Sequence, residues 1–94
     1  MHYECIDIKD ISPNNGAKLQ LWEDVDGNNQ MWQFAKLEED GNVLLGGKYK
    51  ITAKNSGKAM EIGYNSQEDG GTVQQWDYEY GNNQQWFLQK VEEK

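Results

Sequence analysis

The stretch "GNNQMWQF" at residues 27–34 returns as "GNNQQWFL" at residues 81–88, displaced by 54 positions. The same displacement aligns residues 1–40 with residues 55–94 without a gap, and it also pairs Trp22 with Trp76. Self-similarity at a fixed period is the sequence signature of an architecture built from repeated units. We therefore divide the chain, as one small domain, into repeat one (1–40), a connecting segment (41–54) and repeat two (55–94).

Both repeats alternate short apolar-polar stretches with polar turns, the pattern of half-buried strands. No window offers a sustained helical stripe with caps, so an all-β fold is predicted. The connecting segment is too apolar for a linker, and "VLLGG" within it (43–47) is a candidate additional strand. The predicted strands are "CIDIKDI" (5–11), "KLQLWED" (18–24), "QMWQFAKL" (30–37), "KYKITAK" (48–54), "AMEIGY" (59–64), "TVQQWDY" (72–78) and "QQWFLQKV" (84–91).

Charge and composition exclude several classes of partner. The net charge is −7 and the nine basic residues are scattered singly, whereas nucleic-acid binding depends on clustered Lys and Arg. The sequence contains no run of about 18 apolar residues, the length needed to span a membrane. Its first ten residues, "MHYECIDIKD", lack the basic-then-apolar pattern of a signal peptide. The single Cys5 excludes an internal disulfide.

Strand alternation assigns different roles to the two tryptophans of each repeat. Side chains two residues apart on a strand share a face. In "KLQLW" the two leucines share one face, and Gln20 and Trp22 share the other. In "QMWQF" Trp32 shares its face with Phe34. Trp22 is therefore predicted to face solvent and Trp32 to face the core.

The same parity places acidic and amide groups beside the outer tryptophan. With Ile6 and Ile8 inward, Asp7 shares the outward side with Gln20 and Trp22, and Asn29 in the following turn can lean over it. A pyranose has an apolar C–H face that stacks on an aromatic ring and hydroxyls that bond to carboxylates and amides. The constellation therefore predicts a sugar site. Repeat two carries the equivalent Glu61, Gln74, Trp76 and Asn83 on the outer face, with Met60, Ile62 and Trp86 inward.

These motifs resemble the ricin B-type (R-type) lectins and the similar carbohydrate-binding modules of bacterial glycosidases. The resemblance covers essentially the whole chain and rests on "CIDI" and "AMEI", "LQLW" and "VQQW", the Q-x-W signature in "NNQMW" and "NNQQW", and "YKITAKNSGKAMEI". It implies a β-trefoil, three lobes around a pseudo-threefold axis, with the Q-x-W tryptophans in the core. The sugar-binding residues that it implies are Asp7, Gln20, Trp22, Asn29 and Gln30 in repeat one, and Glu61, Gln74, Trp76, Asn83 and Gln84 in repeat two.

Two departures from the family pattern affect these expectations. Glu61 stands where the pattern has Asp, and its extra methylene displaces the carboxylate, so we expect the first site to bind better than the second. The chain also offers three strands and then four, where a trefoil has three lobes of four. We therefore expect incomplete trefoil lobes, either part of a longer protein or a protomer completed by self-association.

Other interpretations of the same residues remain open. Trp22 and Trp76 could pack under a loop or in an interface. Gln30 and Gln84 share a face with the core tryptophans. We therefore expect these side chains to brace the backbone or orient the acidic residue rather than contact the ligand. Tyr78 and Tyr80 could widen the second site. Cys5 is expected to be a small buried or edge residue and His2 a disordered terminus.

The sequence lacks the residues and motifs that enzymatic and cofactor functions require. Asp7 and Glu61 occupy equivalent positions in different repeats, too far apart for a glycosidase pair. Nucleophilic and nucleotide chemistry lack their motifs, and "EDVDGNN" fails as a calcium loop. We expect a non-catalytic module without metal or cofactor. Its predicted partner is a glycan of galactose or xylose type, and the family resemblance implies an extracellular or secreted protein. The alternative is a degenerate trefoil scaffold for protein-protein contacts or self-assembly.

Overall fold

The computed structural model of the chain describes residues 3–37 and 48–88. Within these ranges the fold is all-β, as predicted, and no helix is long and apolar enough to cross a membrane. The candidate strand at 43–47 lies outside the described residues. The strands are β1 (Glu4–Ile8), β2 (Leu19–Glu23), β3 (Trp32–Lys36), β4 (Lys48–Ala53), β5 (Ala59–Ile62), β6 (Val73–Trp76) and β7 (Trp86–Phe87). Single 3-10 turns form η1 (Lys9–Ile11), η2 (Asn28–Gln30), η3 (Gly63–Asn65) and η4 (Asn82–Gln84).

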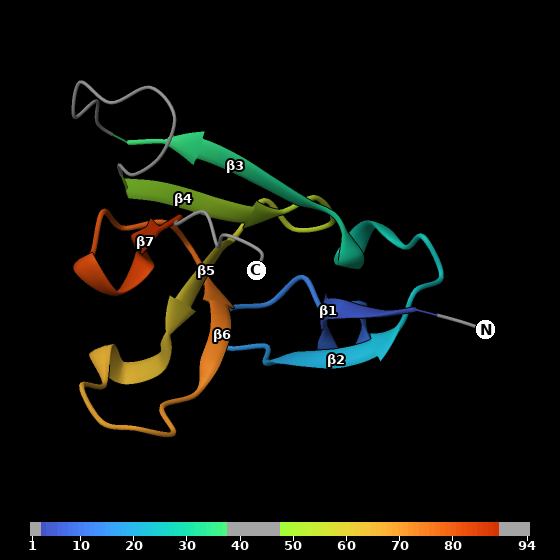
Figure 1. Cartoon of the computed structure of the whole chain (residues 1–94), viewed down its shortest axis with the longest axis horizontal. Helices are drawn as coiled ribbons and strands as arrows, with labels where there is room; N and C mark the ends of the chain where they lie inside the picture. Colours follow the sequence, from blue (N-terminus) through green and yellow to red (C-terminus); the bar gives the residue numbers. More distant parts are fainter. Residues whose placement is uncertain (1–2, 38–47, 89–94) are drawn as a thin grey trace, which may run out of the picture.

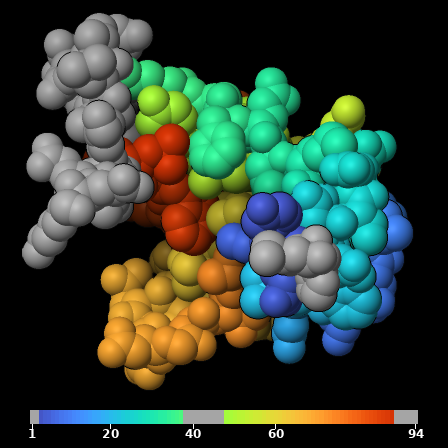
Figure 2. Space-filling view, turned by 45° about the vertical axis from the view of Figure 1, so that its right-hand side comes forward, coloured from blue at the N-terminus to red at the C-terminus, as the bar shows by residue number. Residues whose placement is uncertain are grey.

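The strands form two antiparallel sheets (Figure 1). β1 pairs with β2 alone, while β3, β4, β5 and β6 pair in that order and β7 adds to β4. The two repeats join where the Gly16 N–H donates to the Gln75 carbonyl at 2.8 Å and the Gln75 N–H donates to the Ala17 carbonyl at 2.9 Å. Figure 2 shows repeat one, in blue to green, adjoining the yellow-to-red surface of repeat two. The order of strands therefore repeats along the chain, as the internal repeat requires.

The first strand of each repeat ends earlier than predicted. Residues 9–11 form η1 instead of extending β1, because Asp10 (φ 60°) and Ile11 (φ 55°) take the left-handed conformation. Tyr64 (φ 56°) and Asn65 (φ 51°) do the same in η3. Two successive left-handed residues reverse the chain, which no strand can do. This turn lies beside the outer face of the β1–β2 hairpin.

The apolar core is smaller than the parity argument predicts. Among the described residues, the buried hydrophobic side chains are Ile8, Ile51, Ala53 and Ala59. Trp32 and Trp86 were expected to be enclosed but are only half-buried. Other side chains predicted to face inward are exposed to solvent: Ile6 at 51%, Leu21 at 63% and Phe34 at 51%.

An open apolar cavity accounts for the exposure of Ile6 and Trp86. Its volume is about 350 Å³, and its lining pairs equivalent positions of the two repeats, Ile6 with Met60 and Leu19 with Val73. Trp86 completes the wall. The alternation thus placed Ile6 and Leu19 on one apolar face, whereas Leu21, Trp32 and Phe34 lie outside this cavity. The described lobes, however, do not close around that face, so its side chains keep contact with solvent.

Candidate functional site

The repeated GNNQ turn acts as a hydrogen-bonded lock on each lobe. In repeat one the Asn29 side chain donates to the Ile8 carbonyl at 3.0 Å. Gln30 accepts from the Val25 N–H at 2.9 Å and donates to the Glu23 carbonyl at 2.7 Å. A Cβ on Gly27 would lie 2.6 Å from the Asn29 side-chain oxygen, so the first position of the motif requires glycine.

Repeat two contains the same bonds. Asn83 donates to the Ile62 carbonyl at 2.9 Å, and Gln84 donates to the Asp77 carbonyl at 2.8 Å. The Q-x-W indoles belong to the same lock: Trp32 Nε1 donates to the Ile6 carbonyl at 3.1 Å and Trp86 Nε1 to the Met60 carbonyl at 2.9 Å. The motif therefore occurs twice because, in each lobe, it hydrogen-bonds the last strand to the first strand in the same way.

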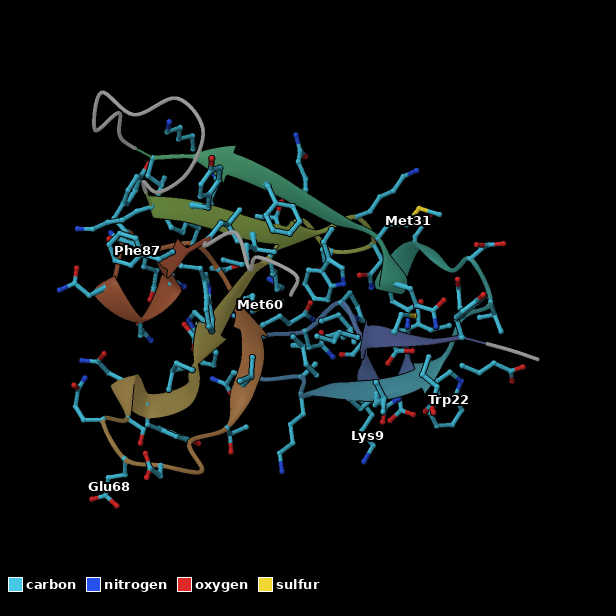
Figure 3. The ribbon with its side chains drawn as sticks, in the orientation of Figure 1. Lys9, Trp22, Met31, Met60, Glu68 and Phe87 are labelled. Carbon is cyan, nitrogen blue, oxygen red and sulfur yellow. The ribbon has the colours of Figure 1, made fainter. Side chains whose placement is uncertain are left out.

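The outer face of the β1–β2 hairpin carries a cavity of about 480 Å³, the first cavity. The strand register places Asp7 directly opposite Gln20, and Trp22, two residues further along β2, is 53% exposed. Figure 3 shows Trp22 and Lys9 projecting on the same side of this hairpin. The structure thus brings together four of the five residues predicted for site one. The first cavity is lined by Asp7, Lys9, Asp10, Ile11, Gln20, Trp22, Val25 and Asn29.

Asp7 lies at the floor of the first cavity with one uncommitted oxygen. The residue shares the outer face with Gln20 and Trp22, as predicted, but it is only 3% exposed. Oδ2 accepts from the Gln30 amide at 3.3 Å. Oδ1 is buried and has no hydrogen-bond partner among the described residues. A buried polar atom without a partner is costly, and a ligand hydroxyl would satisfy it.

A second cavity of about 290 Å³ occupies the equivalent place in repeat two. Its carboxylate is committed to protein donors: Glu61 Oε2 accepts from Gln74 at 2.8 Å, and Oε1 accepts from Gln84 at 3.0 Å and Asn83 at 3.5 Å. The extra methylene of Glu carries the carboxylate to these amides. The lining consists of Glu61, Tyr64, Asn65, Gln74, Trp76, Glu79 and Asn83.

The remaining sequence-predicted residues lie away from the cavities. Gln30 and Gln84 line neither one and form the bracing bonds described above. Tyr78 and Tyr80 contact each other in a tilted arrangement with ring centroids 4.7 Å apart, and the Lys50 ammonium lies 4.7 Å from the Tyr78 centroid. Neither tyrosine lines the second cavity.

The sequence prediction missed the rim of the first cavity. Lys9, Asp10 and Ile11 were assigned to a strand, and Val25 to an ordinary turn. The alternation of β1 breaks at Asp10, where a second polar residue follows Lys9 and Ile11 takes a polar position. This break was one available signal for the turn. A second was the difference between the repeats at these positions, because Ile11 aligns with Asn65 and Val25 with Glu79.

Metal chemistry finds no support in the described part of the chain. Within residues 3–37 and 48–88, no group of three or more His, Cys, Asp or Glu side chains could hold a metal ion. Cys5 is a half-buried free thiol, and burial raises its pKa, with a smaller contribution from the nearby carboxylates of Asp24 and Asp7.

The strand order, the two turn locks and the two tryptophan-lined cavities define a module built from β-trefoil lobes. Residues 28–94 match the ricin-type β-trefoil lectin domain-like family, and the chain belongs to this family. Such domains are generally non-catalytic. No curated protein matches the chain.

Solved structures similar to the chain include a designed protein and a bacterial enzyme. ThreeFoil, a designed three-fold symmetric protein, is 34% identical to this chain, with a TM-score of 0.84. The match covers 94% of this chain and 58% of ThreeFoil. The exo-β-1,3-galactanase 1,3Gal43A from Clostridium thermocellum is 37% identical to this chain, with a TM-score of 0.81. The match covers 92% of this chain and 17% of the galactanase. The chain therefore spans little more than half of the first protein and a small part of the second.

Proposed function

We propose that the chain is a non-catalytic carbohydrate-binding module and that the first cavity is its principal sugar site. The observation that carries this proposal is the uncommitted Asp7 Oδ1 at the floor of the first cavity, beside the half-exposed indole of Trp22. A pyranose stacked on Trp22 can donate a hydroxyl to Oδ1. Gln20 and Asn29 supply further amide groups to the remaining hydroxyls.

The second cavity is a weaker site of the same kind in this proposal. Sugar hydroxyls at Glu61 would have to displace or share the amides of Gln74 and Gln84, which already satisfy both oxygens. Exchanging one good hydrogen bond for another contributes little net free energy. Glu61, Gln74, Trp76 and Asn83 remain its proposed contacts, and Gln84 positions the carboxylate.

The biological partner is a glycan rather than a free monosaccharide. A shallow site with a millimolar Kd contributes only about 4 kcal/mol, and two linked sites on one polymer raise the avidity by roughly 10² to 10⁴. Galactose- and xylose-type glycans are the proposed ligands, and an extracellular location is the proposed setting. The similar protein 1,3Gal43A is an exo-β-1,3-galactanase, which supports a galactan-type partner for this chain.

Intrinsic fluorescence tests the proposal directly. Titration with galactose, lactose, xylose and mannose should perturb the exposed Trp22 indole. Trp22→Ala should lose at least tenfold in affinity, about 1.4 kcal/mol or more, while its unfolding midpoint changes little because the side chain is half-exposed. Tyr3→Ala is the control, since Tyr3 is 75% exposed and lines neither cavity. Unchanged sugar affinity in Trp22→Ala would refute the stacking mechanism.

One observation favours the alternative function, a scaffold for self-assembly without sugar binding. The apolar cavity between the repeats leaves Ile6 51% exposed and Trp86 only half-buried, and exposed apolar surfaces of this kind favour association. Silence on a broad glycan array, together with an oligomeric mass in solution, would support the scaffold. A sugar-binding monomer would exclude it.

A further inference from the structure

We propose that the first cavity selects sugars that carry a methyl-bearing substituent, and that Ile11 and Val25 form the apolar surface that recognises it. The substituent could be the methyl of a 6-deoxy sugar or the methyl of a glycosidic or ether group, since both present the same apolar chemistry. This inference rests on the proposed sugar-binding function of the same cavity.

The two cavities of the chain provide an internal comparison. Their central residues correspond closely, whereas their rims differ in chemical character. Ile11 and Val25 line the first cavity and are 64% and 63% exposed. Their counterparts in the second cavity are the polar Asn65 and Glu79. Two exposed aliphatic side chains at one cavity mouth indicate a ligand with an apolar group there.

Ile11 occupies a backbone conformation that does not suit it. Its φ of 55° lies in the left-handed region, where a β-branched residue is a genuine outlier. Asn65 holds the equivalent position in repeat two at φ 51°, and Asn tolerates this region well. Strain of this kind concentrates at functional sites. An exposed isoleucine gains little burial in return, so packing does not account for its presence.

Contacts from repeat two hold the strained turn in place. The Asn55 side chain donates to the carbonyls of Ile11 at 3.3 Å and Ser12 at 3.2 Å. Gln75 donates to the Ser12 carbonyl at 2.9 Å and the Asn14 carbonyl at 2.8 Å. The Ile11 side chain is therefore presented at the cavity mouth by a fixed backbone, as selective recognition requires.

The charges of the first cavity disfavour an anionic sugar. Its lining contains two carboxylates, Asp7 and Asp10, and one ammonium, Lys9. This balance does not distinguish one neutral sugar from another. The aliphatic pair is the feature of this rim that favours one class of neutral ligand.

Matched sugar pairs test the proposal by calorimetry on the whole chain. D-fucose against galactose measures a methyl at the 6-position, and methyl β-glycosides of galactose, xylose and mannose against the free sugars measure a glycosidic methyl. Burying one such group improves affinity about fourfold. We expect the methyl-bearing sugar to bind about fourfold more tightly in at least one of these two comparisons. The comparison that shows this affinity ratio identifies the source of the methyl.

Two variants separate recognition from folding. Ile11→Asn should bring the affinity ratio close to one and raise the unfolding midpoint by roughly 4 °C or more, as strain is relieved. Leu21→Asn removes an aliphatic side chain that is 63% exposed but lies outside the first cavity, and it should retain the ratio. A ratio near one in the parent, or a ratio that survives in Ile11→Asn, would overturn the inference while leaving sugar binding intact. A parent that binds none of the sugars would overturn the proposed function as well.

Discussion

Replacing the bracing glutamine of each repeat should destabilise the two lobes unequally. Gln84→Met keeps the length of the side chain but removes its polar atoms. Gln84 is 1% exposed, and its loss leaves the Asp77 carbonyl and the Glu79 N–H without this partner and Glu61 Oε1 with only the 3.5 Å bond from Asn83. Each buried polar group left unpaired costs about 1–3 kcal/mol. Because two of these groups lie near solvent, we expect a total of about 3–4 kcal/mol.

Gln30→Met is the matched variant and should cost less. Gln30 is half-buried, and its bonds to the Val25 N–H and the Glu23 carbonyl lie at exposed positions, where water can replace them. Its bond to the buried Asp7 Oδ2 is long, at 3.3 Å. The loss of this weaker bond sets the expected cost at about 1–2 kcal/mol. Urea denaturation followed by tryptophan fluorescence measures both values, with equal m-values as the check for two-state unfolding. Equal costs, or a smaller cost for Gln84→Met, would refute the idea that the burial of the bracing glutamine determines how much its hydrogen bonds add to the free energy of unfolding.

Three further predictions concern single residues. Trp32→Ala should lower the free energy of unfolding by about 3 kcal/mol, the low end for a core aromatic because the ring is half-buried, whereas Trp32→Phe should lose only the indole hydrogen bond, about 1 kcal/mol; thermal unfolding measures both. The hydrogen bond from Lys58 holds the pKa of Asp77 below its usual value of 3.8, so its stabilising effect is complete above pH 3.8 and disappears as the pH falls through the lowered folded pKa. Asp77→Asn should therefore lower the unfolding midpoint at pH 6 and not at pH 2. The raised pKa of Cys5 predicts slower alkylation by iodoacetamide at pH 8 in the folded chain than in urea, and equal rates would contradict it.

Much of the fold could be predicted because the determinants are local and repeated. Alternation over two or three residues identified each strand, and the repeat linked "GNNQ" with a following Trp in both lobes. The prediction failed at residues 9–11, where the strand was extended although Lys9 and Asp10 break the alternation, and η1 forms with Asp10 and Ile11 left-handed. The carbonyls of this turn also accept side-chain hydrogen bonds from Asn55 and Gln75, far along the chain, which no local pattern contains.

The candidate site divides in the same way. The sequence by itself determined which side chains share a face of each strand, since parity along a strand depends only on position. Only the tertiary structure decided that Asp7 Oδ1 stays without a partner while both oxygens of Glu61 are satisfied. It also decided that Trp32 is half-buried and that Ile11 reaches the mouth of the first cavity. Exposure and hydrogen-bond saturation depend on which atoms cover a group, and those atoms come from segments that the local pattern does not contain.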